Sequence, residues 1–229
     1  MINKLVVVHE GIVPESPGSR RHKLVNPHYF CSSVLNDNDA FWKEVSEYIE
    51  STYDICKVKK IYRNSDGGPW SRKFKDYIYG TVHVIDEYHL NKHLAEMTAH
   101  LKDSRDDALA ELRRIIRREN KPDFMAYAEL IKSYSEDESV LQRIEKSVKY
   151  ICENWTACKL RLKRSEGIVG SSTEGQVYHV LSSRMSTLAM GWSRHGASQM
   201  ARLRAYYKNG GNLLELAEYQ QHRLKKAAG

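Results

Sequence analysis

The pattern of apolar and polar residues divides the chain near residue 85 into two parts. Before this point, short β-branched and aromatic runs alternate with turn residues, and four of the five prolines lie before residue 70. After it, apolar residues recur every three or four positions, which is typical of amphipathic helices. We therefore expect an α/β fold with a large helical part.

The first part predicts strands, a loop and one helix. The expected strands are 4–8, 28–33, 58–63 and 81–85. Residues 14–21, rich in Pro, Ser, Gly and Arg, are expected to form an exposed loop. A helix capped by Asp39 is expected because Phe41, Val45, Tyr48 and Ile49 follow at helical spacing. The order of strands and helix favours parallel pairing of the inner strands.

The second part predicts a succession of helices. They are expected over 88–101, from Ser104, from Pro122, from a capping box of Ser135 and Glu138, and over 173–185, 193–208 and 213–224. The apolar stripe from Val140 to Leu162 predicts one continuous helix, and Gly210-Gly211 is expected to end 193–208. We expect the helices before residue 170 to bury their stripes against one another as a bundle.

Composition excludes several classes of protein. The 229 residues are 41% apolar and 28% charged, and no apolar run approaches the roughly 18 residues of a membrane span. The Leu5–Val8 run is too short for a signal peptide, so a cytoplasmic protein without a membrane partner is expected. The four cysteines are too sparse and irregular for a disulfide scaffold or a Cys-x-x-Cys metal clip.

Positive charge is concentrated near the C-terminus. From Arg184 onward, eight Lys or Arg residues face two acids, which accounts for +6 of the formal net charge of +7. Aromatic residues lie among these cations, as at a surface that holds nucleic-acid phosphates and bases. The alternative is a solvated helical face. The candidate DNA-binding residues are Arg184, Arg194, Arg202, Arg204 and Lys208.

Three acids are candidates for chemistry. Asp66 follows a predicted strand and precedes two glycines, so it can present a carboxylate to a metal ion or phosphodiester, or it can simply form an Asp-Gly turn. Glu174 fits a structural role as the partner of an N-cap at Ser171, or a carboxylate aimed at the sheet edge. Asp86 could bind a metal together with His89 and His93, one helical turn apart.

Four blocks of sequence together resemble one family. They are Asn-Ser-Asp-Gly-Gly-Pro-Trp at 64–70, Val-Ile-Asp-Glu-Tyr-His-Leu-Asn-Lys at 84–92, the Glu-Gly-Gln-Val-Tyr-His segment that opens 174–185, and Met-Gly-Trp-Ser at 190–193. In this order, over essentially all 229 residues, they are similar to the ISLre-type insertion-sequence transposases, which are related to Mutator-type transposases.

The resemblance implies an RNase H-like core with a helical insertion. The implied divisions are a partial sheet over 1–87, a helical insertion over 88–170 and C-terminal helices over 171–229. Asp66 matches the second and Glu174 the third of three acids that hold two Mg²⁺ or Mn²⁺ ions. Asp86 and His89 match positions beside this site, and we expect supporting roles for them.

The first acid of the family lies upstream of the segment that matches Val8-His9-Glu10-Gly11, on the opening central strand, and has no match here. Two metal ions about 3.5–4 Å apart need a bridging carboxylate, so the ion pair is not expected to assemble. Loss of a central strand predicts a sheet with a gap or a re-paired edge, or marginal solubility.

We therefore expect a truncated transposase that is inactive alone. Its partners would be transposon-end DNA and a second copy or a full-length transposase. One alternative is a non-catalytic DNA-binding or inhibitory remnant. Another is a metal hydrolase that uses Asp86, His89 and His93.

Overall fold

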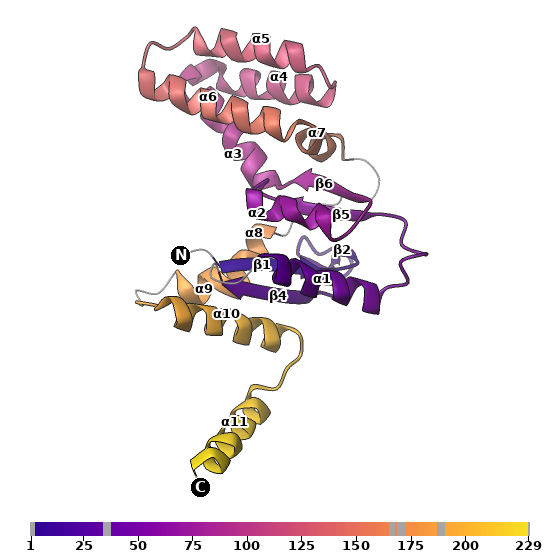
Figure 1. Ribbon diagram of the computed structural model, residues 1–229. Coiled ribbons are helices and arrows are strands. Elements are labelled where there is room, and N and C mark those ends of the chain that lie inside the picture. The colour runs from indigo at the N-terminus through magenta and orange to yellow at the C-terminus, as the bar shows by residue number, and fades with distance from the viewer. Residues whose placement is uncertain (1–2, 34–37, 165–167, 169–172, 187–190, 229) are drawn as a thin grey trace. The chain divides into compact units, whose positions relative to one another are not determined.

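The protein forms two compact units in a computed structural model, which describes residues 3–33, 38–164, 168, 173–186 and 191–228 (Figure 1). Unit 1 comprises Met1–Tyr53 and Glu174–Gly229, and unit 2 comprises Asp54–Thr173. The two parallel strands expected to end at the candidate acids therefore belong to the same unit as the helical bundle.

Unit 1 contains two antiparallel strand pairs. β1 (Asn3–Val8) pairs with β4 (His28–Ser33), so the predictions for 4–8 and 28–33 are confirmed. β2 (Gly11–Pro14) pairs with β3 (His22–Val25), and the predicted loop connects them. The sequence pattern did not predict this hairpin because β3 has two exposed polar residues followed by two half-buried apolar ones, so it shows no alternation of buried and exposed positions.

The helices of unit 1 come from both ends of the chain. They are α1 (Asn38–Thr52), α8 (Thr173–Val177), a π-helical segment (Tyr178–Ser182), α9 (Ser183–Met185), α10 (Arg194–Lys208) and α11 (Leu213–Ala228). The predicted helix 173–185 is thus helical but passes through a π-helical turn. Helix 193–208 is confirmed, and its N-cap is Ser193, whose hydroxyl accepts the N–H of Gly196.

Helix α10 packs against β4 through a row of small residues. Ala197, Ala201 and Ala205, spaced four apart, are buried on this face, which allows the helix backbone to approach the strand closely. Tyr29 in β4 fixes the contact, because its N–H donates to Oδ1 of Asn209, the C-cap of α10, at 2.8 Å. Its hydroxyl donates to Gln176 Oε1 in α8 at 3.0 Å.

Unit 2 begins with a parallel pair of strands. β5 (Ile61–Ser65) pairs with β6 (Thr81–Ile85), with α2 (Pro69–Arg72) and a 3₁₀ turn (Lys73–Asp76) between them. The parallel prediction and the range 81–85 are confirmed. The predicted range 58–63 begins three residues too early and ends two residues too early. At its start, the N–H of Val58 still bonds to the Asp54 carbonyl in a preceding turn.

The rest of unit 2 is the helical bundle. Its elements are α3 (Glu87–Thr98), a 3₁₀ segment (Ala99–Ser104), α4 (Arg105–Arg117), α5 (Lys121–Lys132), α6 (Glu138–Glu153) and α7 (Trp155–Lys163). Leu94, Leu112, Phe124 and Ile144 are fully buried in its core. The predicted stripes therefore do bury against one another.

Two details of the bundle correct the sequence prediction. The stripe from Val140 to Leu162 belongs to two helices, since the backbone leaves helical geometry at Asn154. The N-cap of α6 is Asp137, which accepts the N–H of Ser139, whereas the hydroxyl of Ser135 accepts the N–H of Asp137. The apolar periodicity continues across the break because Ile151, Trp155 and Cys158 all pack into the same core, so the pattern alone does not indicate that the helix ends.

The described strands form three two-stranded sheets, where the resemblance implied one mixed sheet lacking a strand. Both antiparallel and parallel pairing are present, so the coarse prediction of a mixed α/β fold holds. None of the described helices is long and apolar enough to span a membrane.

Candidate functional site

Asp66 lies in a tight turn directly after β5. Its Oδ1 accepts the N–H of Gly68 at 2.9 Å, and Gly67 adopts φ +76°, a left-handed conformation that favours glycine. The turn predicted as the structural alternative is therefore present. It also holds a half-buried carboxylate at the carboxyl end of a parallel strand, where α/β folds commonly bind ligands.

Asp86 follows the neighbouring strand at the same edge. Ser65 pairs with Ile85 in the register of β5 and β6, and the N–H of Asp86 donates to the Ser65 carbonyl at 2.9 Å. The structure thus brings Asp66 and Asp86 to the ends of two adjacent parallel strands.

The Asp86 carboxylate is buried and caps α3. Its Oδ1 accepts the N–H of Tyr88 at 2.9 Å and lies 3.4 Å from both the backbone nitrogen and Nδ1 of His89. An aspartate in this position stabilises the positive end of the helix. Asp86 and His89 are therefore in contact with each other at the strand end adjacent to the Asp66 turn, and their supporting role stays a prediction.

Positive charge surrounds the turn. Arg72 Nε donates to the Gly67 carbonyl at 3.0 Å, and Arg63 donates to the Ser71 carbonyl. Burial lowers the pKa of His83 to about 4, with Arg63 and Arg72 adding to the effect and Asp66 opposing it. His83, whose Nε2 lies 2.9 Å from Ser65 Oγ, is therefore neutral at pH 7, and the arginines supply the positive charge near Asp66.

Glu174 belongs to unit 1, in α8, whereas Asp66 belongs to unit 2. The side chain of Glu174 and the whole of Ser171 lie outside the described residues. Both the capping role and the metal-binding role of Glu174 therefore remain predictions from the sequence.

The candidate metal site of Asp86, His89 and His93 does not form. Among the described side chains, no three His, Cys, Asp or Glu groups cluster to hold a metal ion. His93 instead faces the bundle interior, where its Nδ1 lies 3.0 Å from Ser147 Oγ and 3.3 Å from Glu96 Oε2. Histidines one helical turn apart lie on one face, but His93 is buried by α6, which a local spacing argument does not take into account.

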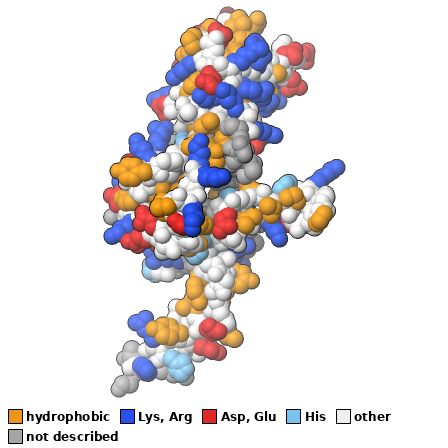
Figure 2. Space-filling view, turned by 90° about the vertical axis from the view of Figure 1, so that its right-hand side faces the viewer, with side chains coloured by type: hydrophobic (Ala, Val, Ile, Leu, Met, Phe, Trp, Pro, Cys, Tyr) orange, Lys and Arg blue, Asp and Glu red, His pale blue; other side chains and the backbone are white. Residues whose placement is uncertain are grey.

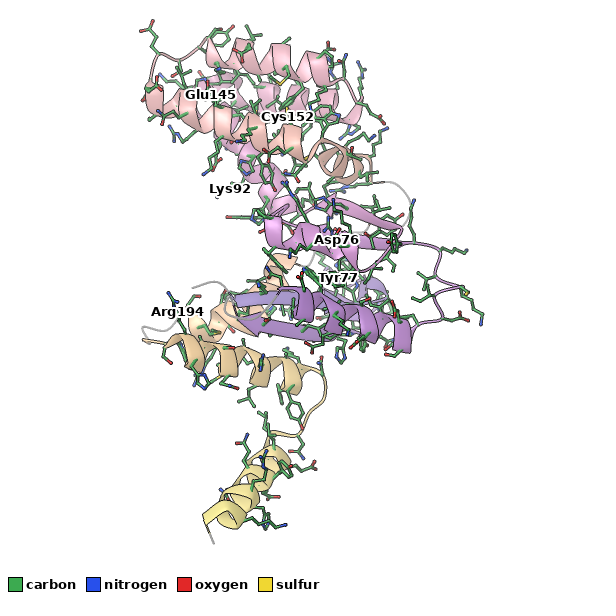
Figure 3. All side chains as sticks on the ribbon, viewed as in Figure 1. Asp76, Tyr77, Lys92, Glu145, Cys152 and Arg194 are labelled. Atoms are coloured by element: carbon green, nitrogen blue, oxygen red, sulfur yellow. The ribbon has the colours of Figure 1, made fainter. Side chains whose placement is uncertain are left out.

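Four of the five candidate DNA-binding residues are exposed: Arg184, Arg194 (labelled in Figure 3), Arg202 and Lys208. Arg204 differs, because its guanidinium donates to the carbonyls of His179 and Val180 inside unit 1. Tyr206, Tyr207 and Tyr219 are also exposed among these cations. Lys and Arg side chains are numerous on the bundle face seen in Figure 2 as well, so exposed cations are not confined to the C-terminal segment.

Unit 1 contains a cavity of about 430 Å³ that the sequence did not predict. It lies between β4, α1 and α10 and is lined by Cys31, Phe41, Glu44 and Arg202, among others. Burial raises the pKa of the Cys31 thiol to about 12, with Arg204 opposing the effect, so this cysteine is not a reactive nucleophile at neutral pH.

Three polar residues of α6, α7 and the junction between them contact the strand ends and were also missed. They are Tyr150, Asn154 and Arg161, and Tyr150 donates its hydroxyl to the Asp66 carbonyl at 2.7 Å. A sequence signal existed in part, because each lies beside the apolar stripe, but nothing in the spacing indicates which distant residue it meets.

Comparison with known proteins identifies the family of this chain. The model of "Uncharacterised protein family (UPF0236)" matches residues 2–222, and the chain belongs to this family. Two relatives from Caldanaerobacter subterraneus subsp. tengcongensis, UPF0236 proteins TTE2489 and TTE0402, are each 36% identical to it over 214 residues, 93% of this chain. The chain spans only 44% and 42% of their lengths.

Several similar proteins come from that one genome. One relative, 34% identical over 214 residues, has a name that joins eleven locus designations, beginning TTE0033/TTE0744. No solved structure matches the chain.

Replacement of Gly67 by alanine should destabilise unit 2 more than the same change at Gly80. Both glycines have positive φ, +76° and +72°, but a Cβ on Gly67 would lie 2.7 Å from Asn154 Oδ1, and one on Gly80 would meet nothing within 4 Å. We expect Gly67→Ala to lower the free energy of unfolding by about 2–4 kcal/mol and Gly80→Ala by about 1–2 kcal/mol. Urea denaturation measures both, and equal losses would contradict the packing of Asn154 against the turn.

Acid should weaken the fold through His83. Its pKa is about 4 in the folded chain and about 6.5 when unfolded, so the unfolded state binds the proton between these values and stability falls as pH drops through this window. By pH 5 we expect a loss of about 1–2 kcal/mol relative to pH 7. His83→Gln should flatten this part of the profile in urea denaturation at both pH values. An unchanged profile in the variant would show that His83 is not the group responsible.

Proposed function

We propose that this UPF0236 protein is part of an ISLre-type, DDE-class DNA transposase that uses divalent cations. The observation that carries the proposal is the position of Asp66, a half-buried carboxylate at the end of a parallel strand with Asp86 at the adjacent strand end. Carboxylate oxygens are the ligands that Mg²⁺ and Mn²⁺ favour, and cations held in this way activate water and stabilise the leaving oxygen of a phosphodiester.

The relatives support a mobile element as the origin of the family. One protein name that joins eleven loci of a single genome is the pattern expected when a gene copies itself to new positions. Enzymes with a fixed metabolic role are rarely present in so many copies. The repetition thus favours a transposase over the metal hydrolase, which also lacks its metal-binding cluster among the described residues.

The strand pairs support an incomplete RNase H-like sheet. Such a sheet joins antiparallel and parallel strands through a central strand that carries the first acid. The antiparallel pair β1–β4 and the parallel pair β5–β6 provide both kinds of pairing, and they lie in separate two-stranded sheets. The 229 residues match two of the three acids, Asp66 and Glu174, so this chain alone would not hold the metal pair.

DNA would be held by the exposed cations of unit 1. Arg194, Arg202 and Lys208 lie on α10, and Tyr206 and Tyr207 are exposed on the same helix. Such contacts with phosphates position a duplex without reading its sequence. This surface also favours the second candidate function, a non-catalytic DNA-binding protein that occupies transposon ends or joins full-length protomers.

The chain alone should not cut DNA. With one acid of the triad unmatched, we expect no nicking of supercoiled plasmid in Mg²⁺ or Mn²⁺, whereas a full-length relative such as TTE2489 should nick it and lose the activity when the residue aligned with Asp66 is changed to Ala. Gel analysis of the plasmid forms measures both. Cation-dependent cutting by this chain that disappears in Asp66→Ala would refute its inactivity, and an inert full-length relative would refute the transposase proposal.

DNA binding should be strongly salt-dependent and should depend on α10. The plot of log K against log[salt] has a negative slope, and each lost phosphate contact makes it shallower by about 0.9. The triple change of Arg194, Arg202 and Lys208 to Gln should therefore reduce the magnitude of the slope by about 2–3. Fluorescence anisotropy with a duplex at several salt concentrations gives the slope. Lys132→Gln is the control, because Lys132 pairs with Glu129 and Glu145 (labelled in Figure 3). Equal slopes for the parent and triple variant would exclude α10 as the DNA-binding surface.

A further inference from the structure

The corner where α6 meets α7 contacts the ends of both parallel strands. We propose that Tyr150, Asn154 and Arg161 of this corner are positioning residues that set the geometry of the Asp66 turn and of the start of α3 at Asp86. The helical bundle is then a support for the site rather than a spacer. The role of the turn in binding metal rests on the proposed function, but the support itself does not.

Tyr150 holds the backbone of Asp66 directly. Its hydroxyl donates to the Asp66 carbonyl at 2.7 Å, across 84 positions of sequence. Burial raises the pKa of Tyr150 above its usual range, with Asp66 and Asp86 adding to the effect, so the hydroxyl keeps its proton and remains a donor. An Asp-Gly-Gly segment is otherwise conformationally free, so this bond restricts the backbone position of Asp66 and with it the direction of the carboxylate.

The ring of Tyr150 is itself fixed from behind. It stacks on the imidazole of His93 with ring centroids 3.9 Å apart, and His93 Nδ1 lies 3.0 Å from Ser147 Oγ. Ser147 in turn donates to Glu96 Oε2 at 3.0 Å. These contacts join α3 to α6, and they leave the tyrosine little freedom to move away from the turn. In Figure 3, the label Lys92 marks α3 and the label Cys152 marks α6.

Asn154 fills the space beside Gly67. The side chain is buried, and its Nδ2 donates to the Tyr150 carbonyl at 2.9 Å. Its Oδ1 lies so close to the turn that a Cβ on residue 67 would be only 2.7 Å away from it. The break between α6 and α7 at Asn154 is what places this amide against the turn. Arg72 adds a connection, since it bonds to the Gly67 carbonyl and lies 3.6 Å from Glu153 at the end of α6.

Arg161 ties the two strands together. Its guanidinium is buried, with Nε donating to the Ile85 carbonyl at 2.8 Å and a terminal nitrogen donating to Asn64 Oδ1. Ile85 directly precedes Asp86, and Asn64 lies two residues before Asp66. The planar guanidinium of Arg161 thus fixes the distance between Asn64 and Ile85, which lie just before Asp66 and Asp86. The single ammonium of lysine cannot reproduce this geometry.

Hydrogen–deuterium exchange of the full chain tests the positioning by itself. Tyr150→Phe keeps the ring stack and removes only the hydroxyl, so the amides of Gly67 and Gly68 should exchange about three- to ten-fold faster while the bundle core is unchanged. Arg161→Lys should accelerate exchange at the ends of both β5 and β6. Tyr127→Phe, on α5 against the same core, is the matched control. Unchanged exchange at the turn in Tyr150→Phe, together with unchanged exchange at the ends of β5 and β6 in Arg161→Lys, would overturn the inference.

Binding of a single Mn²⁺ ion at Asp66, which does not require the metal pair to assemble, links the support to the proposed function. The paramagnetic resonance signal of Mn²⁺ measures this binding. Tyr150→Phe should weaken Mn²⁺ binding about three- to ten-fold, and should have no further effect in a chain that already carries Asp66→Asn. A purely structural tyrosine would leave the affinity unchanged, which would count against the inference. If the parent chain binds no Mn²⁺ but exchange at the turn still accelerates, the support stands and the proposed metal site fails.

Discussion

The parallel pairing of β5 with β6 is the constraint on which the candidate site depends. Ser65 pairs with Ile85, so the residues that follow them, Asp66 and Asp86, emerge at one edge of the sheet. Neither carboxylate would be held near the other by local structure, because a helix and a 3₁₀ turn separate the strands in sequence. A two-stranded sheet is weak on its own and needs packing on its sides for stability.

The helical bundle supplies that packing and also reaches the site with polar groups. Helix α7 packs against β6, and Arg161 donates from it to the carbonyl of Ile85. A buried guanidinium is costly unless its donors are used, and here they are directed at strand-end acceptors. The same helices therefore serve stability through their apolar stripes and the site through the residues beside those stripes.

Unit 1 shows a different division of tasks. Small alanines bring α10 close to β4, while the cations Arg194, Arg202 and Lys208 and the tyrosines Tyr206 and Tyr207 of the same helix are exposed. Arg204 does not belong with the exposed cations, since its guanidinium donates to two backbone carbonyls of the π-helical segment. A count of charges along the sequence treats all cations alike, although solvent-facing ones and those that bond within the protein have different roles.

The sequence by itself determined the features that local periodicity encodes. The bundle stripes, strand 81–85, helix 193–208 and the mixed α/β class all follow from spacings of two to four residues, which the structure confirms. Tertiary structure alone decided the break at Asn154, the burial of His93 and the contact of Tyr150 with the Asp66 turn. These depend on hydrogen bonds and packing between residues tens of positions apart, which a pattern of neighbouring residues does not contain.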